Sequence, residues 1–200
     1  LAMRALAVLV CLTALAASAH AAAPVAGRYG PLLLAVHDGV VSGVFSEARG
    51  GQGGPSFSCT FLFEGRLQDG NADIAVRQAA PGESIEGKLT SQGDAVALQL
   101  DENGDGCLMT SGDMVSEPYV LDLDDRQPAW IGAGVVSAKK TVLQKGPQRD
   151  AQRSKPYLVK FDAFAVLQRQ GDWLQVQFVG GNKPVTGWVR ASDVMLAPRP

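Results

Sequence analysis

The chain has 200 residues and a formal net charge of −2. Apolar residues make up 46% of the sequence and charged residues 19%, a balance that excludes general disorder and allows real cores. The length suits one large domain or two small ones. The 23 glycines and 11 prolines predict many turns and therefore mostly β-structure.

Residues 1–21 predict a secretory signal peptide. Arg4 gives a positive start, residues 5–17 are apolar but too few to span a bilayer, and Ala-x-Ala triplets follow. Cys11 follows a valine where lipidation needs a small residue, so we expect no lipid anchor. The alternative, an N-terminal membrane anchor, is disfavoured by the short apolar stretch. We therefore expect a periplasmic or secreted protein with no membrane insertion after signal removal.

Export would leave two cysteines, Cys59 and Cys107. An isolated pair in an oxidising compartment predicts a disulfide. The alternative, two thiolate metal ligands, lacks a nearby histidine or a further cysteine. We therefore expect the bridge, and neither a metal nor a cofactor.

The charge reverses along the chain. Residues 22–128 carry sixteen acidic and six basic side chains, a net charge of −10. Residues 129–200 carry four acidic and eleven basic side chains, a net charge of +7. This reversal predicts two modules with a boundary near Asp125–Gly134. Two readings stay open: the halves attract each other, or one face steers a charged partner.

The acidic half, residues 22–128, is predicted to be a small antiparallel β-barrel or sandwich. Asp38-Gly39 has the chemistry of a two-residue hairpin turn. From Ser56 to Phe63, apolar residues alternate with hydroxyl-bearing ones, which turns Cys59 inward. Further alternating segments bring the total to seven or eight strands. The disulfide would then tie a central strand to a late one.

The basic half, residues 129–200, is predicted to be a second β-module. Its expected strands are Val135–Lys139, Val142–Leu143, Leu158–Val159, Ala163–Arg169, Trp173–Val179, Thr186–Val189 and Met195–Leu196. Polar residues bounded by prolines predict a loop over Lys145–Pro156. A single 3₁₀ turn is expected at Ala191–Val194.

Two motifs of this half resemble a bacterial SH3-like (SH3b) barrel: G-D-W-x-x-V at Gly171–Val176 and G-W-V-x-x-S-D-V at Gly187–Val194. The resemblance covers residues 134–198. It implies an all-β fold in which an SH3-like barrel follows the first module, binds a peptide or cell-wall fragment without catalysis, and has a Trp beside its groove. The Pro and Tyr of the eukaryotic SH3 groove are missing from Arg190–Asp193, so proline-helix recognition is not implied.

Four residues are candidate ligand contacts: Trp173, Gln175, Tyr157 and Trp188. Period two places Trp173 on a polar strand face with Gln175, where an indole offers a flat surface and one N–H donor. The alternative is that Trp173 packs under the basic loop or against the other module. For Trp188, a structural role at the end of the barrel is the alternative we weigh more heavily.

Asp101, Asn103 and Asp105 have the spacing of the first half of a calcium loop. The twelfth position is Gly112 rather than a glutamate, and the flanking segments are predicted strands. We favour a polar connection between a strand at Val96–Leu100 and one at Cys107–Met109, and cation binding stays open.

A catalytic set is missing from the sequence. After signal removal one histidine, His37, remains, and no G-x-S-x-G motif is present. We therefore expect no enzyme, and the acidic half disfavours nucleic acid as a partner. The predicted function is binding at the cell envelope, where the SH3b-like module recognises peptidoglycan or a peptide. The alternative is a periplasmic inhibitor or immunity-like protein that binds a basic wall-degrading enzyme.

Overall fold

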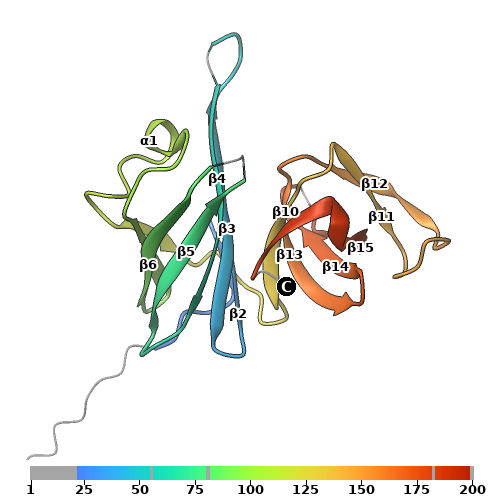
Figure 1. The fold of residues 1–200 in the computed structure, drawn as a ribbon, viewed down its shortest axis with the longest axis horizontal. Helices are drawn as coiled ribbons and strands as arrows, with labels where there is room; N and C mark the ends of the chain where they lie inside the picture. Colours follow the sequence, from blue (N-terminus) through green and yellow to red (C-terminus); the bar gives the residue numbers. More distant parts are fainter. Residues whose placement is uncertain (1–21, 55, 80–81, 182, 199–200) are drawn as a thin grey trace, which may run out of the picture.

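The structure of the chain is a computed structural model that describes residues 22–54, 56–79, 82–181 and 183–198. These residues form two antiparallel sheets (Figure 1), which confirms the predicted all-β fold. The signal-peptide prediction, on residues 1–21, lies outside the described residues. In the described part of the chain, no helix is long and apolar enough to cross a membrane.

The first sheet is a series of hairpins with the order β8-β7-β6-β5-β4-β3-β2-β1-β9. Its strands are β1 (Gly27–Tyr29), β2 (Leu32–His37), β3 (Val40–Gly50), β4 (Ser56–Arg66), β5 (Asn71–Gln78), β6 (Ser84–Gln92), β7 (Ala95–Leu100), β8 (Tyr119–Asp122) and β9 (Asp125–Arg126). The predicted turn at Asp38-Gly39 is confirmed, with φ of 50° and 72°.

The segment from β8 to β9 joins the two edges of the first sheet. β8 pairs with β7, and β9, three residues further along, pairs with β1 at the opposite edge. The sheet therefore curls round on itself, as a barrel or sandwich requires. Its interior is filled by apolar side chains, among them Tyr29, Leu32, Phe45, Phe61, Phe63, Ile74, Leu89 and Leu98.

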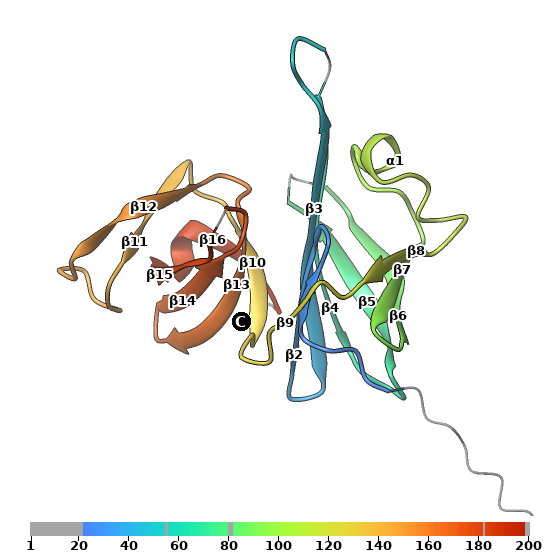
Figure 2. The same cartoon turned by 180° about the vertical axis from the view of Figure 1, so that it is seen from behind.

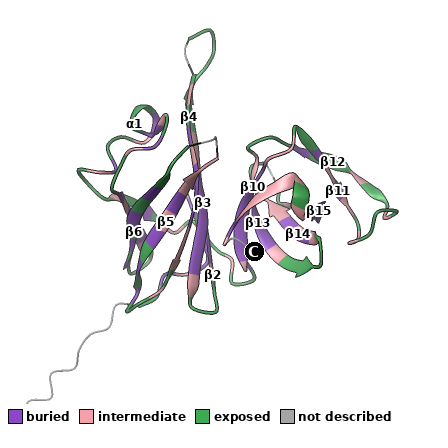
Figure 3. Ribbon diagram, viewed as in Figure 1, coloured by how far each residue is buried: buried purple, intermediate pink, exposed green. Residues whose placement is uncertain are grey.

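The outer face of β2, β3 and β4 is also buried (Figure 3), because the second sheet packs on it. The shared core contains Leu33, Ala35, Val44, Leu62, Trp130, Ala133, Val135, Ala165 and Ala197. The contact between the oppositely charged halves is therefore apolar at its centre. Ion pairs such as Arg28–Asp124 and Arg126–Asp94 join residues within the acidic half.

The second sheet has the order β12-β11-β15-β14-β13-β10-β16. Its strands are β10 (Gly132–Val136), β11 (Lys140–Gln144), β12 (Arg153–Val159), β13 (Ala163–Gln170), β14 (Trp173–Phe178), β15 (Val185–Arg190) and β16 (Val194–Ala197). The predicted 3₁₀ turn is present at Ala191–Asp193. Whether the sheets fold as separate modules stays a prediction, since they share a core.

The predicted loop over Lys145–Pro156 is wrong at its C-terminal end, where Arg153–Pro156 belong to β12. β12 is an edge strand of the second sheet. Edge strands tolerate proline and exposed basic side chains, which protect them from pairing with other chains. A polar, proline-bounded segment can therefore be an edge strand as well as a loop.

The predicted disulfide is confirmed: Cys59 and Cys107 are bonded, with Cα atoms 4.5 Å apart. The prediction that Cys107 lies on a late strand, however, is wrong. Cys107 begins a four-residue helix, α1 (Cys107–Thr110), that packs against β3 and β4 (Figure 2). Gly106 turns the chain into this helix with a φ of 74°.

The loops on either side of α1 are hydrogen-bonded to each other. The Asn103 amide donates to the Asp113 carboxylate (2.9 Å) and accepts from the Met114 N–H (3.1 Å). Hydrogen bonds from the Ser116 hydroxyl and the Asn103 amide hold the pKa of Asp113 well below its usual range. The described residues contain no group of three or more His, Cys, Asp or Glu that could hold a metal ion.

Replacement of Gly106 by alanine tests the close packing of the residue before α1 against the backbone of β4. A Cβ atom here would overlap the backbone oxygen of Ser58, and the φ is unfavourable for any L-residue. We expect Gly106→Ala to lower the free energy of unfolding by more than about 2 kcal/mol. The matched control is Gly112→Ala, with a φ of 88° but open space around it, which should cost ~1 kcal/mol. If a denaturant titration gave both variants the same loss in free energy of unfolding, this close packing would be contradicted.

Candidate functional site

The four candidate ligand contacts lie on one face of the second sheet. Residues directly opposite each other in an antiparallel pair point to the same face. The opposed pairs on this face are Trp173–Arg190, Gln175–Trp188, Gln144–Trp188 and Val142–Tyr157. The opposite face of β14, with Leu174 and Val176, packs in the core of the sheet.

A hollow of about 180 Å³ opens on this face. It is lined by Lys140, Thr141, Val142, Gln144, Arg153, Trp173, Arg190 and Asp193. Three cations and one carboxylate therefore surround it. The carboxylate is already engaged, because Asp193 accepts a hydrogen bond from the Thr141 hydroxyl at 2.9 Å.

Two of these cations, Arg190 and Lys140, contact aromatic rings. The guanidinium carbon of Arg190 lies 5.3 Å from the Trp173 ring centroid, and the Lys140 ammonium lies 3.7 Å from that of Tyr157. Among the described residues, no carboxylate lies within 4 Å of the charged groups of Lys140, Arg153 or Arg190. These three cations are therefore available to an anionic ligand.

Gln144 adds a polar atom without a partner. Its side-chain oxygen is shielded from solvent and accepts no hydrogen bond from the described residues. A buried acceptor left unpaired costs free energy, and native structures satisfy nearly all such atoms. Because this oxygen is shielded, a ligand in the hollow does not reach it in this conformation of the side chain.

The candidate residues differ in accessibility. Trp173 is half-buried and Tyr157 is 53% exposed, so both can present a ring surface to a ligand. Trp188 lies on the same face but is only 8% exposed, because its neighbours cover it. Gln175, opposite Trp188, is half-buried. The hollow is lined by Trp173 but not by the other three candidates.

Four residues that line the hollow were not among the predicted ligand contacts: Lys140, Gln144, Arg153 and Arg190. Their strands are distant in sequence from Trp173, and the register that brings them together is not a local pattern. Of these four residues, Arg190 would have been the easiest to predict. It lies in the G-W-V-x-x-S-D-V motif, three residues before Asp193, and pairs directly with Trp173.

Comparisons of the chain with protein-family models, with curated proteins and with solved structures find no match. The candidate site therefore depends on the residues and their geometry alone. The SH3b resemblance stays a prediction.

Proposed function

We propose that the chain is an exported, non-catalytic binding protein of the cell envelope, and that the Trp173 hollow recognises a carboxylate-bearing peptide such as a peptidoglycan stem peptide. The observation that supports this most strongly is the hollow itself. It combines an indole ring, three cations that lack carboxylate partners among the described residues, and the polar side chain of Gln144.

The chemistry of the hollow matches such a peptide group by group. Arg190 and Arg153 are suited to hold carboxylates through two parallel N–H bonds, and Lys140 adds a third positive charge. The Gln144 side chain adds a polar group to the lining. Trp173 would cover the aliphatic part of the peptide side chain.

Retention on purified peptidoglycan tests the proposal. We expect the wild-type protein to sediment with peptidoglycan and Trp173→Ala to lose at least tenfold in affinity, because the ring forms one wall of the hollow. The control Arg169→Ala removes an exposed cation outside this hollow and should bind like the wild type. Failure of the wild type to sediment would contradict the proposal.

A second candidate is a basic protein partner on the acidic sheet. Leu108 and Met109 of α1 are 57% and 58% exposed, and five exposed acidic side chains flank them in the sequence between residues 101 and 117. A basic wall-degrading enzyme fits this pattern of charge. Its binding would weaken steeply as salt is added, and a flat salt titration would exclude it.

A further inference from the structure

Two hollows lie along the contact between the sheets and share one residue, Phe161. The larger is about 320 Å³ and is also lined by Ser46 and Phe178, and the smaller is about 160 Å³ and is also lined by Thr60. Ser46 and Thr60 are opposed across β3 and β4, with their hydroxyl oxygens 3.3 Å apart. The two hollows therefore adjoin at Phe161 and at this pair, and we call them together the Phe161 groove.

Phe161 has an unusual backbone conformation. It lies in a tight turn in which the Asp162 N–H donates to the Val159 oxygen (3.0 Å) and the Val159 N–H donates to the Asp162 carboxylate (2.8 Å). Its φ is 73°, a value that glycine or asparagine adopts readily and a bulky residue rarely does. Strain of this kind costs of order 1–3 kcal/mol.

Burial does not fully account for the aromatic residue in this turn. Phe161 is 41% exposed, so much of the ring faces solvent over the groove. The Lys160 ammonium lies 4.9 Å from the ring centroid and restricts its orientation. A strained, exposed and oriented aromatic ring is explained by a ligand that packs on it.

The polar lining of the groove is mostly neutral. It includes the hydroxyls of Ser46, Ser58 and Thr60 and the amide of Gln78. Three charged residues also line it: Arg28 pairs with Asp124 at 3.5 Å, Asp162 accepts from its own turn, and Asp105 is an exposed carboxylate. The lining therefore matches a ligand with many hydroxyl or amide groups and little charge.

We propose that the Phe161 groove binds an uncharged oligosaccharide, with one sugar ring packed on Phe161. The C–H groups on one side of a pyranose ring are weakly positive and pack on the negative face of an aromatic ring, while its hydroxyls exchange hydrogen bonds with serine, threonine and glutamine. The larger hollow alone is within the size range of small-molecule sites. This site is distinct from the Trp173 hollow and takes a ligand without carboxylates.

The probe for this site is a peptide-free hexamer of β-1,4-linked N-acetylglucosamine, titrated by calorimetry. We expect the wild-type protein to bind it and Phe161→Ala to bind at least tenfold more weakly. Thr60→Val, which keeps the side-chain shape and removes the hydroxyl, should bind several-fold more weakly. Tyr157→Ala is the matched control, because it removes an exposed ring that does not line the Phe161 groove and should leave saccharide binding unchanged.

Three results would overturn the proposal: no binding of the hexamer by the wild type, unchanged binding by both Phe161→Ala and Thr60→Val, or equal loss in Tyr157→Ala. The two sites are separated by a second titration with a stem peptide. Phe161→Ala should bind that peptide like the wild type, so that failure at one site leaves the other test intact.

Discussion

Replacement of Trp130 by alanine is expected to lower the free energy of unfolding by about 3–5 kcal/mol. Trp130 is 1% exposed and lies in the apolar core that joins the two sheets, packed with Leu33 and Val44 from one side and Ala133 from the other. Its indole N–H donates to the Gln177 side-chain oxygen at 3.0 Å. Truncation would leave a cavity between the sheets and remove this hydrogen bond.

Denaturant unfolding followed by far-ultraviolet circular dichroism measures this effect. The matched control is Trp173→Ala, a half-buried tryptophan of the second sheet that should lose far less stability. We also expect the sheets of Trp130→Ala to unfold at different denaturant concentrations, because their shared core is weakened. A loss no larger than that of Trp173→Ala would show that the contact between the sheets contributes little.

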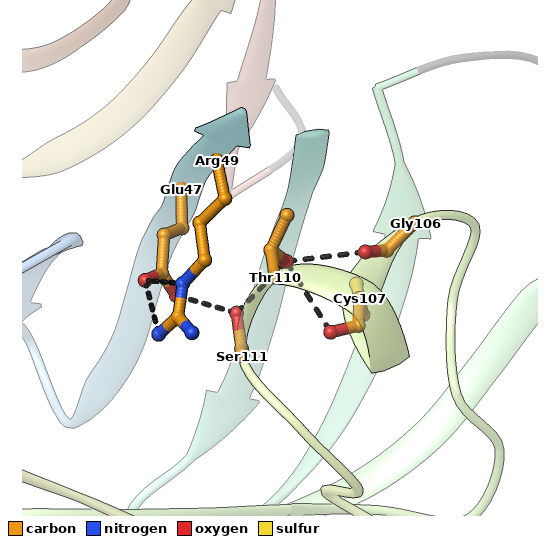
Figure 4. Close-up of polar contacts among 6 residues, drawn as sticks. All are labelled: Glu47, Arg49, Gly106, Cys107, Thr110 and Ser111. Carbon is orange, nitrogen blue, oxygen red and sulfur yellow. Dashed lines mark hydrogen bonds and ion pairs between the residues drawn. The ribbon is translucent and has the colours of Figure 1, made fainter. Parts of the chain in front are cut away.

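Removal of the disulfide by Cys59→Ala and Cys107→Ala together is expected to cost about 4 kcal/mol in the chain-entropy treatment. The bridge closes a loop between residues 48 apart in sequence, and its cysteines are fully buried. Without the bridge, α1 would depend on the hydrogen bonds around Thr110 and Ser111, drawn in Figure 4. A helix of four residues is too short to be stable without such anchors.

The same unfolding titration measures the loss. Wild-type protein unfolded in the presence of a reductant should match the double variant, because both lack the cross-link. The link from the Ser111 hydroxyl to the Glu47 carboxylate, at 2.6 Å, should survive in the folded variant. A decrease below about 1 kcal/mol would contradict the role of the bridge in stabilising this end of the sheet.

Local patterns predicted the interior of the first sheet well. The alternation from Ser56 to Phe63 turns Cys59, Phe61 and Phe63 inward, as the structure shows. The turn at Asp38-Gly39 could be predicted because an Asp-Gly pair strongly favours a two-residue hairpin turn. The pairing of Cys59 with Cys107 followed from there being no other cysteine after residue 21.

The burial of the outer face of β2, β3 and β4 was not predicted, although the sequence contained a pattern that indicates it. Leu32–Val36 is a continuous apolar run, which is typical of a strand buried on both faces. Helix α1 carried no comparable signal, because four residues are too few to show a helical period. Its position is set by the disulfide and by the turn at Gly106, both of which are tertiary features.

The candidate site was predicted in part. Period two placed Trp173 and Gln175 on the polar face, and the register agrees with that placement. The cations of the hollow come from three different strands, so only the pairing of β11, β12 and β15 brings them together. The conformation of Phe161 was not predicted, since its positive φ cannot be read from the sequence.

Recognition of carboxylates on a peptide is the function that we propose for the Trp173 hollow. Its most direct test is a calorimetric titration of the wild-type protein with one stem peptide in two forms, with free carboxylates and with the same groups amidated. We predict that amidation weakens binding at least tenfold and that Arg190→Ala removes most of this difference, because Arg190 lies at the hollow beside Trp173. Equal affinity for the two forms would contradict the proposal.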